Sequence, residues 1–231
     1  MALRTFIVLV KLNSIFLQVL CVLLSASLAT AASPANVRAI AQKVDERYNR
    51  LRTLQAEFTE TYRGAGIDRT ESGTLWLKKP GKMRWEYRSP SEKLFVSDGH
   101  EAWFYVPGDR QVRKTDVRKL DDLRSPLAFL LGKTKLEKEL QGLSLAADIP
   151  PKDPANLVLR GVPKAMADRV NQVLLEIAPD GHIAGITIEE QDDSVTEYHF
   201  EQQKDDVELS DRRFQFSPPS GVEVVDGSFG P

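Results

Sequence analysis

The sequence has very few residues that bind metals or form covalent cross-links. Its single cysteine, Cys21, lies in the N-terminal apolar stretch, so the chain beyond that stretch can form no disulfide. The three histidines, His100, His182 and His199, do not have the spacing of metal ligands. These shortages predict a domain that is stabilised by a hydrophobic core and that has no metal site and no cofactor.

Sequence motifs of common enzymes are also missing. There is no G-x-S-x-G segment of the kind that serine hydrolases use. The segment GAG at residues 64–66 lacks the third glycine and the strand-to-helix context of a dinucleotide-binding loop. The adjacent acids Asp192 and Asp193 are interpreted as solvated residues of a hairpin turn. No local pattern therefore indicates catalysis, and we expect the protein not to be an enzyme.

The N-terminus has the ordered features of a secretory signal peptide. Arg4 and Lys11 form a basic region, an apolar run follows at residues 12–24, and Ala29-Thr30-Ala31 is a signal-peptidase site. The run is short for a membrane span of about 20 residues, which favours cleavage over an uncleaved anchor. We expect cleavage after Ala31, with Ala29 as the alternative, and a protein that works outside the cytoplasm.

The remaining chain, residues 32–231, is weakly acidic. Of the 31 basic residues, 29 remain after the signal is removed, against 33 acidic residues, which leaves a net charge of −4. This balance argues against nucleic acid as a partner. No second apolar run is long enough to cross a bilayer, and the length suits a single domain.

Hydrophobic periodicity predicts a mainly β protein that begins with one helix. Residues 34–51 have apolar side chains at helical spacing and charges on the other face. From residue 54 the period changes to two, and turns rich in glycine, proline and aspartate separate the strands of an antiparallel meander. The expected strands are 54–62, 70–78, 82–87, 94–97, 102–106, 111–115, 157–162, 172–178, 183–190, 195–203 and 214–216, with an extended piece at 222–225.

A short apolar segment, SPLAFLLG at residues 125–132, interrupts the meander. Its serine is a predicted N-cap, its proline takes the first helical position and its glycine ends the helix. Because the helix is apolar all round, it must be buried on every side or must cover an apolar surface. So many strands favour a sheet that curves into a shell, with this helix and the helix at 34–51 over one face.

Large aromatic residues concentrate in the first half of the meander. The group contains all three tryptophans: Trp76, Trp85, Trp103, Tyr87, Tyr105, Phe95 and Phe104. Two interpretations stay open at this point. The residues form an ordinary core beneath the helices, or one face of the curved sheet lines an apolar cavity.

Several segments resemble the outer-membrane lipoprotein carrier protein family (LolA). GTLWLKKPGKMRW at 73–85 is similar to an early hairpin of that family, as is VSDG at 96–99 followed by WFYVP at 103–107. EQDD at 190–193 resembles its late hairpin turn, and FQFSPPSGV at 214–222 its C-terminal signature. The segments follow the family's order over nearly the whole chain beyond the signal. Cys21 lacks the small preceding residues of a lipidation site, which favours the soluble carrier over the lipid-anchored receptors that share its fold.

The resemblance implies both a fold and a function. The fold is mainly β with α: an incomplete, curved antiparallel β-barrel with helices that lid a hydrophobic cavity. The function is that of a monomeric periplasmic carrier, which takes acylated lipoproteins from an inner-membrane ABC transporter to an outer-membrane receptor. Two alternatives stay open: a periplasmic carrier or sensor of another lipid, such as a glycolipid, and, with less support, a lipid esterase.

Strand parity and the resemblance together predict the residues of the site. We expect the cavity to be lined by Phe58, Leu75, Leu77, Met83, Trp85, Tyr87, Leu94, Val96, Trp103 and Tyr105, and the lid to contain Phe129, Leu130 and Leu131. In the family, an arginine before the strand-ending proline hydrogen-bonds to helix carbonyls of the lid. Lys79 takes that position here; lysine can donate to carbonyls but lacks the guanidinium fork.

Overall fold

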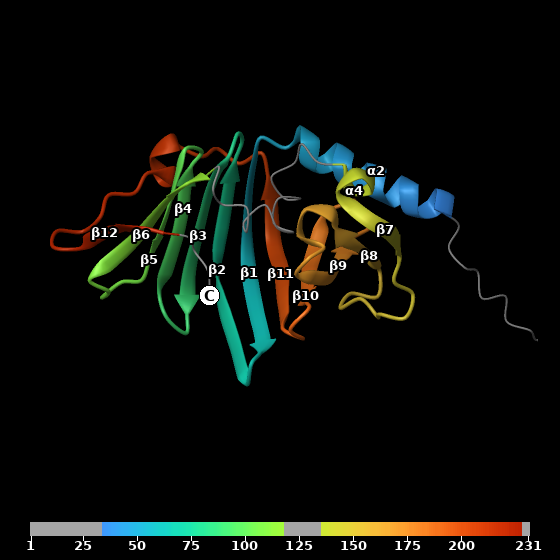
Figure 1. Ribbon diagram of the computed structural model, residues 1–231. Coiled ribbons are helices and arrows are strands. Elements are labelled where there is room, and N and C mark those ends of the chain that lie inside the picture. The colour runs from blue at the N-terminus through green and yellow to red at the C-terminus, as the bar shows by residue number, and fades with distance from the viewer. Residues whose placement is uncertain (1–33, 118–134, 228–231) are drawn as a thin grey trace, which may run out of the picture. The chain divides into compact units, whose positions relative to one another are not determined.

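The computed structural model describes residues 34–117 and 135–227 (Figure 1). The predicted signal peptide at 1–31, the predicted helix at 125–132 and the predicted lid residues Phe129, Leu130 and Leu131 lie outside the described residues. The strands are β1 (Thr53–Gly64), β2 (Ile67–Lys78), β3 (Lys82–Ser89), β4 (Lys93–Asp98), β5 (Glu101–Tyr105), β6 (Gln111–Asp116), β7 (Leu140–Leu145), β8 (Leu157–Pro163), β9 (Val170–Ile177), β10 (Ile183–Glu190), β11 (Val195–Asp205) and β12 (Glu223–Asp226).

These strands form one open sheet in the order β12-β6-β5-β4-β3-β2-β1-β11-β10-β9-β8-β7. The pairs are antiparallel except for β12, which runs parallel to β6. β1 and β11, far apart in the sequence, pair at the centre and join the two halves of the meander (Figure 1). The mainly β, antiparallel prediction is confirmed, while β7 is a strand that the irregular apolar pattern of residues 136–145 did not predict.

Within residues 34–117 and 135–227, the helical elements are short apart from α2. They are α2 (Pro34–Arg50), α4 (Leu136–Glu139) and the 3₁₀ turns η3 (Lys164–Met166) and η4 (Asp211–Phe214). The helix predicted at 34–51 is confirmed, and its apolar stripe of Val37, Ala41, Val44 and Tyr48 is buried. Among the helices of the described ranges, none has both the length and the apolar character to span a membrane.

The main hydrophobic core lies between α2 and one face of the sheet, which we call the inner face. Along β1 this face bears Ala56 and Phe58, while Glu57 and Thr59 point to the outer face. The core continues into the second half of the meander through Leu159, Leu175 and other side chains that are fully buried. Burying each such side chain contributes about 1.5–3 kcal/mol, so the inner face holds the two halves together.

The chain after β11 crosses the outer face. Leu209 and Phe214 pack against Trp76 there, and the guanidinium of Arg213 lies 4.5 Å from the centre of the Trp76 ring. The strand predicted at 214–216 is therefore wrong: Phe214 ends the turn η4, because its side chain is buried against the sheet instead of pairing with it. β12 then adds to the edge of the sheet beside β6 (Figure 1).

Candidate functional site

The inner face carries a cluster of stacked aromatic side chains. The Phe58 ring centre lies 4.7 Å from that of Trp85 and 4.9 Å from that of Tyr87. Trp85 in turn contacts Tyr198 at 5.8 Å and Phe200 at 6.3 Å. We call these five residues the aromatic wall. They come from β1, β3 and β11, and together they form a continuous apolar surface.

The ring distances also show that the sheet is concave on this side. β3 and β11 are separated by β2 and β1, so in a flat sheet they would lie about 14 Å apart at the usual strand spacing. The rings of Trp85 and Tyr198 nevertheless meet at 5.8 Å. The strands therefore curve around the inner face, as the incomplete barrel of the sequence analysis requires.

The structure places six of the ten predicted cavity residues on the inner face. They lie in, or pack against, the main core: Phe58, Leu75, Leu77, Met83, Trp85 and Tyr87. Alternation along β1, β2 and β3 was sufficient to find them, because each strand is long enough to show its period.

The other four predicted residues require correction. Trp85 pairs with Phe95, and Phe95 pairs with Phe104, so these three side chains share the inner face. Leu94, Val96, Trp103 and Tyr105 therefore point to the outer face, where Phe216 contacts the rings of Trp103 and Tyr105 at 5.6 and 5.8 Å.

The reason for the error lies in the hairpin connections. Side-chain alternation shows which residues of one strand share a face. Which residues of the next strand lie on that same face is decided by the cross-strand pairing. The prediction for β4 and β5 assigned large apolar residues to the inner face without knowing how these strands pair with β3. Phe95, Ala102 and Phe104 were consequently missed as inner-face residues. The signal that would have found them is the number of residues in each connecting turn.

Toward the β1–β2 hairpin, the inner face becomes polar. Glu60 and Glu71 stand directly opposite each other on β1 and β2 and are both buried, 7% and 4% exposed. The Tyr87 hydroxyl donates to Glu60 at 2.7 Å. Arg69 Nε lies 3.0 Å from a Glu71 oxygen, and Lys93 forms a second ion pair with Glu71. The inner face thus has an apolar part under α2 and a charged part beyond the aromatic wall.

Burial changes the proton affinity of these groups. It raises the pKa of Glu60; the hydrogen bond from Tyr87 opposes this rise, and the charge of Glu71 adds to it. Burial also raises the pKa values of the Tyr87 and Tyr198 hydroxyls, so both remain protonated donors.

Lys79, which takes the position of the family's lid-binding arginine, contacts α2. Its ammonium group donates to the carbonyl oxygen of Tyr48 in the last turn of the helix. Carbonyls at a helix C-terminus lack intrahelical donors and carry partial negative charge, so a lysine is well suited to this position. Whether Lys79 also holds the lid stays a prediction, because Phe129, Leu130 and Leu131 lie outside the described residues.

The hydroxyl of Tyr48 anchors α2 to the sheet. It accepts a hydrogen bond from the backbone N–H of Ile183 at 2.9 Å and donates to Gln203 Oε1 at 3.4 Å. The amide of Gln203 donates back to the carbonyl of Ile183 at 2.8 Å. Burial raises the pKa of the Tyr48 hydroxyl, which therefore stays neutral.

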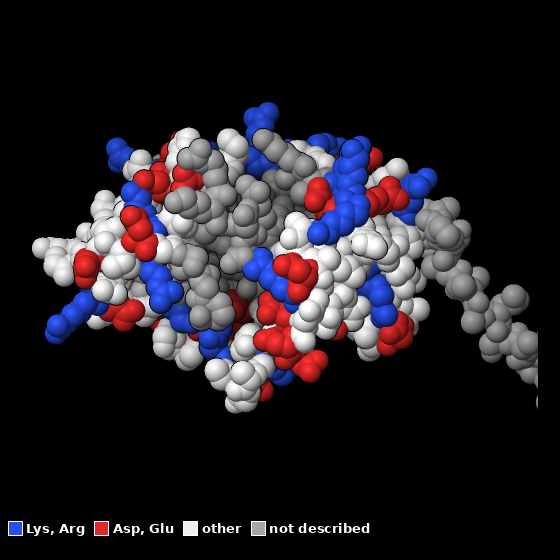
Figure 2. Space-filling model, in the orientation of Figure 1, with Lys and Arg blue, Asp and Glu red and all other residues white. Residues whose placement is uncertain are grey.

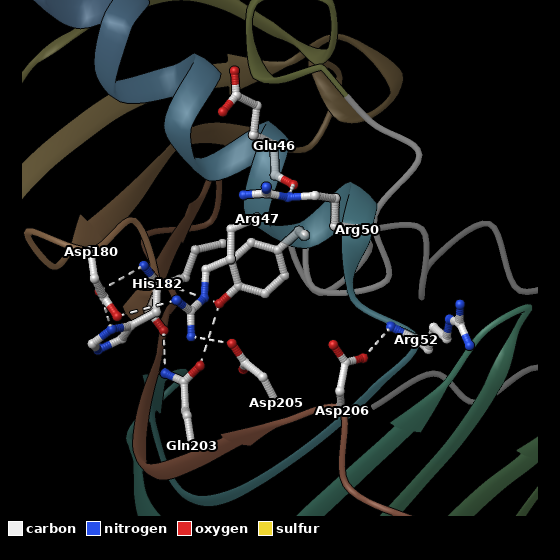
Figure 3. Close-up of polar contacts among 11 residues, drawn as sticks. Glu46, Arg47, Arg50, Arg52, Asp180, His182, Gln203, Asp205 and Asp206 are labelled. Carbon is white, nitrogen blue, oxygen red and sulfur yellow. Dashed lines mark hydrogen bonds and ion pairs between the residues drawn. The ribbon is translucent and has the colours of Figure 1, made fainter.

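A second set of contacts fixes the same end of the helix. Arg47 pairs with Asp180 at 3.2 Å and with Asp205 at the end of β11 (Figure 3). His182 Nδ1 lies 2.5 Å from an Asp180 oxygen. Partial burial would raise the pKa of Asp180, but the hydrogen bonds from His182 and the charge of Arg47 outweigh it and lower the pKa. α2 is thus a fixed cover over the second half of the meander.

On the face seen in Figure 2, the described residues form no large patch of a single charge. Among the described residues there, lysine and arginine alternate with aspartate and glutamate. In residues 34–117 and 135–227, no three histidine, aspartate or glutamate side chains gather in a way that could hold a metal ion.

The sequence matches a known protein family over most of its length. Residues 49–217 match the family described as outer membrane lipoprotein carrier protein LolA. An outer-membrane lipoprotein carrier protein of Nitrosospira multiformis is 32% identical over 75% of this chain and 82% of its own. That of Alkalilimnicola ehrlichii is 30% identical, covering 90% of this chain and 95% of its own.

Solved structures agree on the fold. A conserved protein of Thermus thermophilus superposes with a TM-score of 0.53 at 14% identity, over 82% of this chain and 98% of that one. The lipoprotein LppX of Mycobacterium tuberculosis gives a TM-score of 0.51 at 14% identity, over 77% and 100%. At this identity the likeness shows the architecture, an open β shell with a helix over one face.

Proposed function

Because the chain belongs to the outer membrane lipoprotein carrier protein family (LolA), we propose that its inner face holds the acyl chains of lipoprotein cargo. As a member of that family it is a periplasmic carrier and not an enzyme. The observation that supports the cargo site is the aromatic wall, from Phe58 to Phe200, on the concave side of the sheet. A long acyl chain needs a continuous apolar surface, and the wall supplies one.

The cost of exposing acyl chains explains why a carrier is needed. Each methylene that leaves the bilayer for water costs about 0.8 kcal/mol, so a lipoprotein with several chains is held in its membrane by tens of kcal/mol. A free protein extracts such a molecule too slowly to be useful. We therefore propose an energy-driven donor, the inner-membrane ABC transporter, and an outer-membrane receptor that accepts the cargo.

The proposed site comprises the six inner-face residues named above together with Phe95, Ala102 and Phe104, which the register adds. Phe129, Leu130 and Leu131 are proposed as a lid over them. A lid with two states of similar free energy would cover the apolar surface when cargo is absent and would move aside when cargo binds. We propose residues 1–31 as the cleaved signal and 32–231 as one carrier domain.

The register provides a sharp test, because Phe104 and Tyr105 are adjacent on β5 and face opposite sides. A photo-crosslinking amino acid at position 104 should label a synthetic triacylated lipopeptide, and the same amino acid at position 105 should not. Equal labelling at both positions, or none at 104, would contradict the proposed site.

Mass spectrometry of ligands that co-purify from the periplasm tests the cargo class: acylated protein supports this proposal, and a glycolipid alone would overturn it.

A further inference from the structure

Six polar side chains form one cluster at the hairpin end of the inner face. They come from β1, β2, β3, β4 and β11, and we call them the polar cluster: Glu60, Arg69, Glu71, Tyr87, Lys93 and Tyr198. Glu60 is central, because Glu71 pairs with it on one side and Tyr198 on the other. Charged groups in a buried surface are costly unless they are paired, so their presence beside the aromatic wall requires a reason.

The polar cluster satisfies its own charges. Arg69 Nε lies 3.0 Å from a Glu71 oxygen, Lys93 forms a second ion pair with Glu71, and the Tyr87 hydroxyl donates to Glu60 at 2.7 Å. The two cations neutralise the two carboxylates, so the cluster has no net charge that would attract or repel a charged headgroup. Its effect on cargo must come from where it lies and from its polarity.

The polar cluster lies across the end of the aromatic wall. Along β1, Glu60 is the next inner-face residue after Phe58, and along β4, Lys93 precedes Phe95 on that face. Tyr87 is shared, since its ring packs on Phe58 and its hydroxyl bonds to Glu60. The inner face of these strands therefore changes from apolar to polar along one line.

An acyl chain that crossed this line would cover cations that still contact water. The side chains of Arg69 and Lys93 are 45% and 21% exposed, so each keeps part of its hydration. A chain laid over them would remove that water and supply no hydrogen bond in return, which is unfavourable. On the aromatic wall, by contrast, the burial of each methylene is favourable.

We propose that the polar cluster ends the surface on which acyl chains lie, and so limits how much chain a cargo can bury. Methylenes lie on the aromatic wall and stop at Glu60, while Tyr62 and Thr196, the next inner-face pair toward the hairpin, stay free of lipid. This inference rests on the proposed function, because it concerns the same face. It adds a discrimination by chain length, in which methylenes beyond the limit add nothing to the affinity.

Photolabelling of the wild type tests the boundary directly. Monoacylated lipopeptides with a diazirine at successive positions of the chain are bound to the mature protein and irradiated, and the labelled residues are mapped by mass spectrometry. Label should appear on Phe58 and Trp85 and on neither Tyr62 nor Thr196, wherever in the chain the diazirine lies. Label on Tyr62 or Thr196 would overturn the inference.

An apolar variant tests the cause. Its substitutions remove the charges and hydroxyls of the polar cluster together: Glu60→Leu, Arg69→Leu, Glu71→Leu, Lys93→Leu, Tyr87→Phe and Tyr198→Phe. Replacing the whole network avoids the penalty of leaving one buried charge unpaired. Label should then reach Tyr62 or Thr196. The matched control is Arg63→Leu/Glu197→Leu, which removes an ion pair at the same end of β1 and β11 but on the outer face, and should keep the wild-type labelling.

Chain length gives an independent measure. Each added methylene should tighten binding roughly fourfold while it still meets apolar surface. In the wild type this gain should stop at a limiting length. In the apolar variant it should continue, so that the longest chain binds roughly tenfold or more tightly to the variant than to the wild type. The same dependence on length in both proteins would mean that the polar cluster sets no limit.

The outcomes separate this inference from the function on which it rests. If the wild type binds the lipopeptides but is labelled at Tyr62 or Thr196, the boundary is wrong and the carrier function stands. If the wild type binds no lipopeptide, both fail. Should the apolar variant not fold, the wild type alone decides: label confined to the aromatic wall, together with a limiting chain length, supports the inference, and a gain that continues through the longest chain contradicts it.

Discussion

The rings of Phe58 and Tyr87 lie 4.9 Å apart although strand β2 runs between their strands. The residue of β2 that pairs with both is Gly73, which has no side chain to separate them. The aromatic wall therefore depends on a residue without a side chain, Gly73, at this position of β2. A glycine weakens a strand, but it permits close approach of the neighbours on either side.

We expect Gly73→Ala to destabilise the protein by about 1–3 kcal/mol or more. A Cβ at this position would lie 1.9 Å from the carbonyl oxygen of Glu86, and a backbone atom cannot move aside as the end of a side chain does. Urea unfolding measures the loss. Gly227→Ala, with no neighbouring atom within 4 Å of its Cβ, should have little effect. Equal stability of the two variants would contradict the role assigned to Gly73.

Lys79→Met should loosen the end of α2. Removing the donor to the Tyr48 carbonyl should cost about 1 kcal/mol, and hydrogen exchange of the last turn of the helix should become faster. Lys79→Arg keeps a donor and should retain most of the stability. If Met and Arg at this position behave alike, the hydrogen bond does not hold the helix.

Tyr48→Phe should cost about 1–3 kcal/mol, because it leaves the buried N–H of Ile183 without its acceptor. The change removes one oxygen and preserves the ring, so packing is little altered. Tyr105→Phe on the outer face is the comparison, and thermal unfolding is the measurement. A loss no larger than that of Tyr105→Phe would show that the anchor of α2 lies elsewhere.

Trp85 should report cargo binding and Trp103 should not. In a variant with Trp85 as its sole tryptophan, a lipopeptide with brominated acyl chains should quench the fluorescence by contact with the inner face. In the matched variant with Trp103 alone, the quenching should be weak, since that ring lies on the outer face against Phe216. Stronger quenching of Trp103 would place the chains on the wrong side of the sheet.

The raised pKa of Glu60 predicts a particular pH dependence. Because its folded-state pKa lies above the ordinary 4.5, the folded protein keeps the proton longer than the unfolded chain as pH rises. This group therefore lowers stability progressively from about pH 4.5 up through its folded-state pKa. Glu60→Gln should remove that loss. The free energy of unfolding of the variant, measured with urea, should therefore rise relative to that of the wild type between pH 5 and pH 7.5. A constant difference across this range would contradict the assignment.

Much of this protein is predictable from local sequence. The helix at 34–50 and ten of the strands follow from apolar spacing and from turn residues, since each pattern depends on neighbours along the chain. The same alternation identified Phe58, Met83 and Trp85. The order of family segments, from residue 73 to residue 222, indicated the carrier family that the comparisons show.

Only the tertiary structure decided which face each later strand presents. Phe95 and Phe104, and not Leu94 and Tyr105, face inward, because register is set by cross-strand pairing and by turn length. The contact of Lys79 with Tyr48 and the opposition of Glu60 and Glu71 are equally nonlocal. Sequence thus determined the elements and the family, while long-range pairing and curvature determined which side chains meet.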